Sequence, residues 1–341
     1  MISFKPKQVT KKLLSALPER ARDVLEKRYG LGKDGETSTL EAIGKLYGIT
    51  RERVRQIENY GITSIQKSEV YREFEPVFTE LQDTIAKMGG GLIAEHVLLQ
   101  EITDDQSLRN HIYFLLVVGT PFYRSKENNS YAHRWYTEKK TAELVEKALH
   151  NLYEGIERDE LISEEEMLKR FKSELIEIAD KNDEQVLKRW LQISKDISAN
   201  PLGEWGHASS PNVRVKGIRD YAYLVVKRHG SPMHFREVAE AIEELFNKKA
   251  HTATCHNELI KDERFVLVGR GLYALTEWGY SAGVVKDVLR EILEEHGPLT
   301  REEIIDKVRK ERYVKDNTII VNLQDTSLFR KLSNGMYTLA E

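Results

Sequence analysis

The 341 residues, 40% hydrophobic and 31% charged, are ordinary for a globular chain with two or three average domains, or more if each is small. No run approaches the ~18 apolar residues of a membrane span, and the first residues lack the apolar core of a signal peptide. The single cysteine, Cys255, excludes an internal disulfide. We therefore expect a cytoplasmic protein with no membrane contact. The net charge of -3 is unevenly distributed: residues 1–60 hold 13 Lys/Arg against 8 Asp/Glu, whereas residues 61–212 hold 18 Lys/Arg against 27 Asp/Glu. A chain with this charge balance is not expected to bind polyanions strongly without sequence preference.

The first clear pattern is a pair of helices in residues 39–58, TLEAIGKLYGITRERVRQIE. The apolar face of the first helix consists of Leu40, Ile43 and Tyr47, at helical spacing. Gly48 stands where the chain must turn sharply, and Thr50 is a natural N-cap for the second helix. Val54 and Ile57 then face the core, so the stretch has the spacing of a helix-turn-helix.

The second helix of this pair leaves four polar side chains on its outer face: Arg51, Glu52, Arg55 and Gln56. In a major groove, Arg can pair with guanine, Gln with adenine, and Glu can accept a hydrogen bond from cytosine. The alternative is a water-exposed helix held by charge pairs. Because the turn, the cap and the base-reading residues occur together, the pattern favours a helix that reads double-stranded DNA.

Residues 13 to about 65 closely resemble region four of housekeeping-type sigma factors, with LPERARDVLEKRYGL as the leading helix and residues 39–58 as the promoter-reading motif. The resemblance implies that three side chains contact bases of a promoter element and that two others contact mainly the DNA backbone. The implied DNA-binding residues are Thr50, Arg51, Glu52, Arg53, Arg55 and Gln56, of which Arg51, Glu52 and Gln56 are the base-contacting positions. It also implies that the leading helices can bind the flap of core RNA polymerase.

One departure from this family is plain after the motif. Where the family continues with a basic helix, this chain has Asn59, Tyr60 and Gly61. Glycine weakens a helix by ~1 kcal/mol relative to alanine. The sequence therefore gives little support to a further contact between this tail and DNA phosphates.

The middle of the chain predicts further helices and one hairpin. The expected helices lie near residues 73–88, 96–119 (two helices), 138–153, 163–178 and 183–193. A Ser163/Glu166 capping box opens the helix at residues 163–178. Residues 122–124 and 131–136 can form the two strands of a wing, and residues 200–213 are expected to form a tight, packed turn. We interpret residues 66–155 and 156–212 as two degenerate winged helices.

An internal repeat occupies the carboxyl-terminal part of the chain. The segment from Pro232 to Glu237 reappears from Pro298 to Glu303, an offset of 66 residues. Each copy predicts three helices followed by a short hairpin around a glycine, which is the pattern of a winged helix.

The first copy, residues 213–280, resembles the HARE-type helix-turn-helix, which occurs in the delta subunit of bacterial RNA polymerase, in chromatin proteins and fused to restriction enzymes. This resemblance implies a winged helix that handles DNA or the transcription machinery. Its candidate contact residues, on the third helix and the wing, are Thr252, Thr254, His256, Asn257, Arg264 and Arg270. His251, Cys255 and His256 lack a fourth ligand, so we expect no metal.

These patterns predict a mainly α chain, a multi-domain string of helix-turn-helix and winged-helix modules with short β-hairpin wings. The expected modules are 1–65, 66–155, 156–212, 213–280 and 281–341. The sequence has no phosphate-binding glycine loop, no HExxH motif and no nucleophile elbow, so we expect no enzyme, no catalytic residues and no cofactor.

We expect a sigma-like accessory transcription factor at the nucleoid, with promoter DNA and core RNA polymerase as its partners. The aromatic-rich promoter-melting helices of sigma factors are absent, so we do not expect it to start transcription alone. The alternative is a delta-like polymerase-binding or architectural protein that acts mainly through protein contacts. A third possibility, a regulator of DNA modification or phage defence, rests only on where HARE domains occur.

Overall fold

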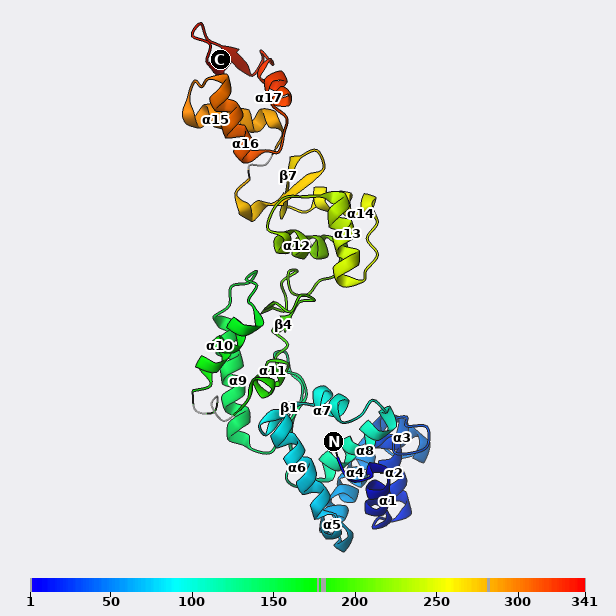
Figure 1. Cartoon of the computed structure of the whole chain (residues 1–341). Coiled ribbons are helices and arrows are strands. Elements are labelled where there is room, and N and C mark those ends of the chain that lie inside the picture. Colours follow the sequence, from blue (N-terminus) through cyan, green and yellow to red (C-terminus); the bar gives the residue numbers. More distant parts are fainter. Residues whose placement is uncertain (1, 177, 179–181, 281–282, 341) are drawn as a thin grey trace. The chain divides into compact units, whose positions relative to one another are not determined.

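The computed structural model describes residues 2–176, 178, 182–280 and 283–340. Helices dominate the described residues and are joined by small antiparallel sheets of two or three strands (Figure 1), which confirms the predicted mainly α fold class. The chain forms two compact units, the first made of Met1–Ala199 and Glu204–Ser209, the second of Asn200–Gly203 and Ser210–Glu341. The finer division into five modules stays a prediction.

The first unit begins with four helices that contain the predicted helix-turn-helix. These are α1 (Pro6–Ser15), α2 (Glu19–Tyr29), α3 (Leu40–Tyr47) and α4 (Arg51–Lys67). Val24 of α2, Ile43 of α3 and Val54 of α4 form one small buried cluster. The turn and the N-cap therefore lie where the sequence predicted them, with Thr50 accepting a hydrogen bond from the Arg53 amide.

The rest of the first unit repeats one order of elements twice. The first set is α5 (Glu69–Glu73), α6 (Glu75–Gly89), β1 (Leu92–Ala94), α7 (Glu95–Ile102), α8 (Gln106–Val118), β2 (Tyr123–Ser125) and β3 (Arg134–Tyr136). The second set is α9 (Lys139–Glu154), α10 (Glu164–Glu174), α11 (Glu184–Leu191), β4 (Ile197–Ala199) and β5 (Trp205–His207). After the short α5, each set runs helix, helix, helix, hairpin, as in a winged helix.

The second unit shows the same order twice more within its described residues. Its elements are α12 (Ile218–His229), β6 (Met233–His234), α13 (Phe235–Phe246), α14 (Thr252–Lys261), β7 (Phe265–Gly269), β8 (Leu272–Leu275) and the 3₁₀ turn η2 (Thr276–Trp278), then α15 (Val285–His296), α16 (Arg301–Glu311), α17 (Asp316–Leu323), β9 (Phe329–Lys331) and β10 (Tyr337–Leu339). A strand or a single bridge precedes the second helix in every set and pairs with the last strand: β1 with β3, β6 with β8, Ile162 with Trp205, and Leu299 with Tyr337.

One predicted helix end is wrong. The helix that opens at Ser163 ends at Glu174, not near residue 178. Leu175 leaves the helical conformation, donates its amide to the Lys172 carbonyl and buries its side chain in the core, so tertiary packing ends the helix. Residues 177 and 179–181 lie outside the described part of the chain.

The third helices α8 and α11 are packed inside the first unit. α8 lies against α1, α2 and α4, while α11 lies against α6 and β1. The Trp190 indole of α11 donates to the Gly89 carbonyl (2.7 Å) and the Asn110 amide of α8 donates to the Gly35 carbonyl (2.8 Å). A winged helix usually presents its third helix to DNA. The packing leaves little of α8 free to do so, whereas Glu184 and Gln185 keep part of α11 exposed.

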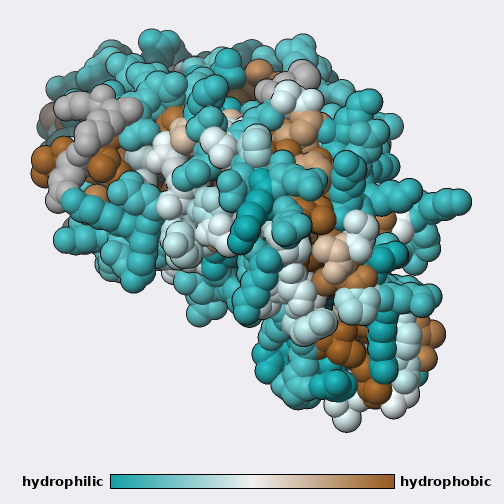
Figure 2. All heavy atoms as spheres, turned by 90° about the horizontal axis from the view of Figure 1, so that it is seen from below, coloured by the Kyte–Doolittle hydropathy of each residue, from teal (hydrophilic) through white to brown (hydrophobic). Residues whose placement is uncertain are grey.

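The water-exposed surface is mainly polar. On the face shown in Figure 2, apolar side chains appear in small groups between hydrophilic ones, as on ordinary protein surfaces. Among the described residues, no helix has both the length and the apolar character needed to span a membrane.

Candidate nucleic-acid interface

The turn between α3 and α4 is shaped by two glycines. Gly48 adopts a left-handed conformation (φ 64°) and ends α3, because its amide reaches back to carbonyls of that helix. A Cβ at Gly44 would lie 2.7 Å from the Ile49 carbonyl oxygen, so only glycine allows the chain to cross α3 this closely. Together, Gly44 and Gly48 fix the angle between α3 and α4 at this turn.

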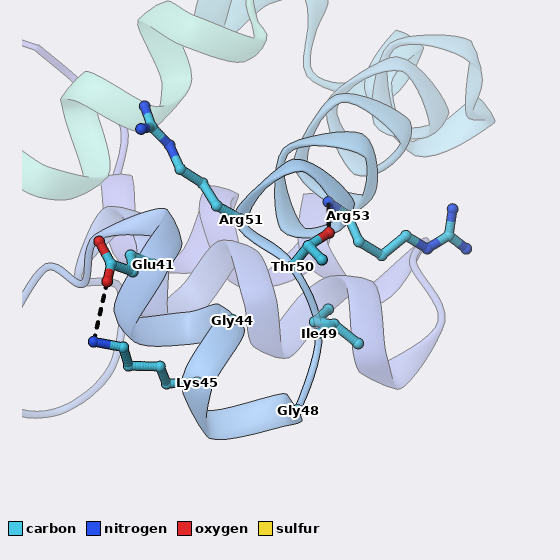
Figure 3. Close-up of a pocket in the computed structure, with 8 residues that line it drawn as sticks. All are labelled: Glu41, Gly44, Lys45, Gly48, Ile49, Thr50, Arg51 and Arg53. Carbon is cyan, nitrogen blue, oxygen red and sulfur yellow. Dashed lines mark hydrogen bonds and ion pairs between the residues drawn. The ribbon is translucent and has the colours of Figure 1, made fainter.

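Around this turn the surface forms an open hollow of about 540 Å³. Figure 3 shows Arg51 and Arg53 extending in different directions from the start of α4, while Lys45 is paired with Glu41 on α3 (3.0 Å). The two arginines flank the amino-terminal end of α4, which carries partial positive charge. The hollow is therefore electropositive on the α4 side and suits an anionic surface.

The predicted base-reading residues lie together and are exposed. Val54, Glu58, Gly61 and Ile65 face the core, and the opposite face of α4 is open to water. The exposed residues at the start of this helix are Thr50, Arg51, Glu52, Arg53, Arg55 and Gln56. Within the first unit, the described residues leave 58% of the Glu52 side chain and 53% of the Arg55 side chain exposed.

Two pairs of side chains on α4 are already organised. The Arg55 guanidinium donates two hydrogen bonds to the Glu52 carboxylate (2.6 and 2.9 Å), and these hydrogen bonds lower the pKa of Glu52. Arg53 donates to the amide oxygen of Gln56 (2.9 Å). Such exposed pairs add little stability, but they set the direction in which Glu52 and Gln56 point.

A buried acidic residue supports α4 from behind, and sequence reasoning missed it. Glu58 is only 9% exposed, accepts a hydrogen bond from the Tyr29 hydroxyl (2.9 Å) and lies 3.4 Å from the Arg28 guanidinium. Burial, followed by the nearby Glu58 charge, raises the pKa of Tyr29, so the hydroxyl keeps its proton. The available signal was the position of Glu58 one turn after Val54, on the apolar face of the helix.

Of the contact residues predicted in the second unit, some are exposed in the structure and others are not. Thr252, Thr254 and Asn257 are exposed on α14, and Arg270 is exposed in the turn between β7 and β8. His256 is partly buried, because its ring stacks on Phe235 (4.3 Å between centroids). Four of the six predicted side chains are therefore available to a partner.

Arg264 of this group is held inside its own module. Its guanidinium contacts Asp262 (2.6 Å), Asp220 (2.8 Å) and Asn212 (3.0 Å), and only 20% of the side chain is exposed. Burial opposes ionisation of Asp262, but the hydrogen bonds from Arg264 dominate and lower its pKa. The sequence pattern placed Arg264 on the wing, whereas the structure engages it in an ion-pair cluster beside α12.

The lone thiol lies in the same module. Cys255 is buried, and burial raises its pKa to about 11. Among the residues that the structure describes, no three His, Cys, Asp or Glu side chains come together as metal ligands.

Comparison with known proteins accounts for the amino-terminal part of the first unit. Residues 13–67 match the family model Sigma-70, region 4. These residues form a sigma-70 region 4 domain. The predicted resemblance is thereby confirmed for this domain, while the HARE-type assignment of residues 213–280 stays a prediction.

Three curated relatives match this chain over this region. The RNA polymerase sigma factor SigA of Bacillus sp. is 52% identical over 52 residues (15% of this chain, 14% of that protein). SigA of Nostoc sp. is 44% identical over 66 residues (18% and 17%), and SigA1 of Synechococcus elongatus is 61% identical over 46 residues (14% and 11%). The match to this chain thus spans less than a fifth of the length of each relative.

Proposed function

We propose that this protein is a sequence-specific DNA-binding transcription regulator that reads a promoter element through α4. One observation carries the proposal. The region 4 domain keeps the side chains of Arg51, Glu52 and Gln56 together and exposed, whereas the same unit packs most of the third helix α8 away from solvent.

The chemistry of these side chains fits direct base readout. A major groove about 12 Å wide admits one helix. Arg51 can donate two hydrogen bonds to guanine, Glu52 can accept from the amino group of cytosine, and the Gln56 amide can pair with adenine. Arg53 and the electropositive hollow at the turn would then lie near the phosphate backbone and fix the register.

The proposed partners are promoter DNA and core RNA polymerase. The relatives that share the region 4 domain carry the name RNA polymerase sigma factor, but they share less than a fifth of their length with this chain. We therefore propose an accessory, sigma-like role at the nucleoid, in which the exposed residues of α14 and Arg270 add a weaker contact.

A second candidate is a polymerase-binding or architectural role that acts mainly through protein contacts, like that of the delta subunit. The winged helices favour it: α8 is largely packed away from solvent, Arg264 is engaged internally, and α17 contains no Lys or Arg. On this view the winged helices would hold protein surfaces, and the amino-terminal helix-turn-helix would serve for docking.

Selection of bound sequences from a random duplex pool, with and without core polymerase, tests the proposal. We expect one enriched motif, and Arg51→Ala should lower preference at a single base position by about 1–3 kcal/mol. The matched control is Lys11→Ala, which removes an exposed positive charge from α1, away from α4. Equal loss on all sequences would indicate backbone contact, and binding to nuclease-treated polymerase without any enriched motif would favour the second candidate.

A further inference from the structure

The outer face of α4 continues past the positions that match promoter-reading residues. The buried side of this helix follows the spacing i, i+4, i+7, i+11, with the residues Val54, Glu58, Gly61 and Ile65. The same spacing, started two residues earlier, gives the ridge that points away from the core. This outer ridge consists of Glu52, Gln56, Asn59 and Thr63, all of them exposed.

Asn59 is held in regular helix, despite the glycine that follows it closely. α4 is unbroken over the 17 residues Arg51–Lys67. Gly61 is buried, and a Cβ there would lie 3.0 Å from Leu25 Cδ1 of α2. Gly61 thus allows α4 and α2 to approach closely, and this packing offsets the poor helix propensity of glycine. The sequence had predicted a weakened tail at this point, whereas the structure extends the reading helix.

The Asn59 side chain is available to a partner. It is exposed and has no hydrogen bond to the described part of the chain, whereas Glu52 accepts two hydrogen bonds and Gln56 accepts one, each from a neighbouring arginine. A free carboxamide offers two donor hydrogens and one acceptor oxygen. This combination matches the adenine edge in the major groove, which presents an acceptor and an amino group.

The distances along α4 are suitable for one more base contact. At 1.5 Å per residue, Asn59 lies about 10 Å from Glu52 and about 4.5 Å from Gln56 along the helix axis. Stacked bases are about 3.4 Å apart, so the ridge from Glu52 to Asn59 covers about three base-pair steps. A single recognition helix can read bases over this length, as the spacing of homeodomain contacts illustrates.

We propose that Asn59 is a further base-reading residue of α4, which recognises an adenine beyond the base pair faced by Gln56. The proposal rests on the proposed function of α4 and extends its target by one position. A phosphate contact fits less well, because Asn59 carries no charge and lies on the central ridge, whereas Arg53 lies on its flank.

The test measures binding of the full-length protein to the duplex selected from the random pool and to all of its single-base variants. We expect Asn59→Ala to reduce the preference for one A·T pair by about 5- to 150-fold, while preferences at the other positions are kept. Alanine is a better helix former than asparagine, so loss of the helix cannot explain such a change. An unchanged preference at every position, or an equal loss on all duplexes, would overturn the proposal.

Two control variants separate this proposal from the function on which it rests. Gln56→Ala should remove preference at a different, adjacent position, and Thr63→Ala, one turn beyond Asn59 on the same ridge, should leave the profile unchanged. If Gln56→Ala acts as expected and Asn59→Ala does not, only the further inference fails. If neither variant changes the profile, the proposed readout by α4 fails as well.

Discussion

At the residue scale, Glu58 on the buried side of α4 helps to hold this helix, whose opposite side carries the proposed DNA contacts. It lies on the buried side of α4, where an acidic group is costly unless it is hydrogen-bonded or paired. The Tyr29 hydroxyl and the Arg28 guanidinium supply these partners from α2. The contact ties α4 to α2 about half a turn beyond Gln56, one of the proposed base-reading residues.

Tyr29→Phe should therefore destabilise the first unit without touching the exposed face of α4. The change removes the donor to Glu58 and leaves the carboxylate with weaker compensation, which costs about 1–3 kcal/mol for a buried group. Urea unfolding monitored by circular dichroism measures the change in the free energy of unfolding. Tyr60→Phe is the matched control, because Tyr60 is 57% exposed and should change stability by less than about 0.5 kcal/mol. Equal effects of the two variants would contradict the role given to Glu58.

At the element scale, local chemistry made the helix-turn-helix predictable. The cap at Thr50, the left-handed Gly48 and the apolar spacing of α3 act within a few residues, so they can be read directly from the sequence. The cap and the turn appear in the structure at the expected residues. The structure also shows capping boxes at Thr300 and His234, which are equally local.

The features that were missed depend on partners distant in sequence. The end of α10 at Glu174 is set by burial of Leu175, and the packing of α8 against the region 4 domain joins residues about 80 apart in the chain. Arg264 illustrates the same limit: its sequence position suggests an exposed wing, but Asp220, 44 residues away, pairs with it. Propensity and spacing carry no information about such pairs.

The two predicted wing arginines should consequently behave differently. Arg264→Ala leaves the buried Asp220 and the partly buried Asp262 with less compensation, so it should destabilise the second unit by about 3–5 kcal/mol. Arg270→Ala removes an exposed charge and should leave stability almost unchanged. Thermal unfolding of the full-length variants compares the two effects.

DNA binding completes this comparison. If the wing contacts phosphates, Arg270→Ala should reduce the slope of log K against log salt by about one, because one fewer counterion is released. An unchanged slope would mean that the wing faces protein or solvent. Similar stability losses in Arg264→Ala and Arg270→Ala would contradict the ion-pair cluster.

At the scale of the whole molecule, the first unit has one large hydrophobic core beside the small cluster of Val24, Ile43 and Val54. It extends from Val9 in α1 through Ile65 in α4 and Phe114 in α8 to Trp190 in α11 and Trp205 in β5. The region 4 domain therefore shares a hydrophobic core with the rest of the first unit. The apolar faces of α2 and α4 are completed by α8, which lies outside the residues that match the family model.

The first unit should accordingly unfold as one cooperative body. Amide hydrogen exchange on the full-length protein can compare Val54 in α4 with Leu187 in α11, two buried residues of different modules. We expect the same opening free energy at both, and we expect Asn110→Ala, which removes the α8 hydrogen bonds to the Gly30 and Gly35 carbonyls, to lower both by about 1–3 kcal/mol. Arg72→Ala, an exposed change on α5 of the same unit, is the control and should alter neither value. A lower opening free energy at Val54 alone would show that the region 4 domain folds and opens independently. In that case, α8 would contact α4 without stabilising it.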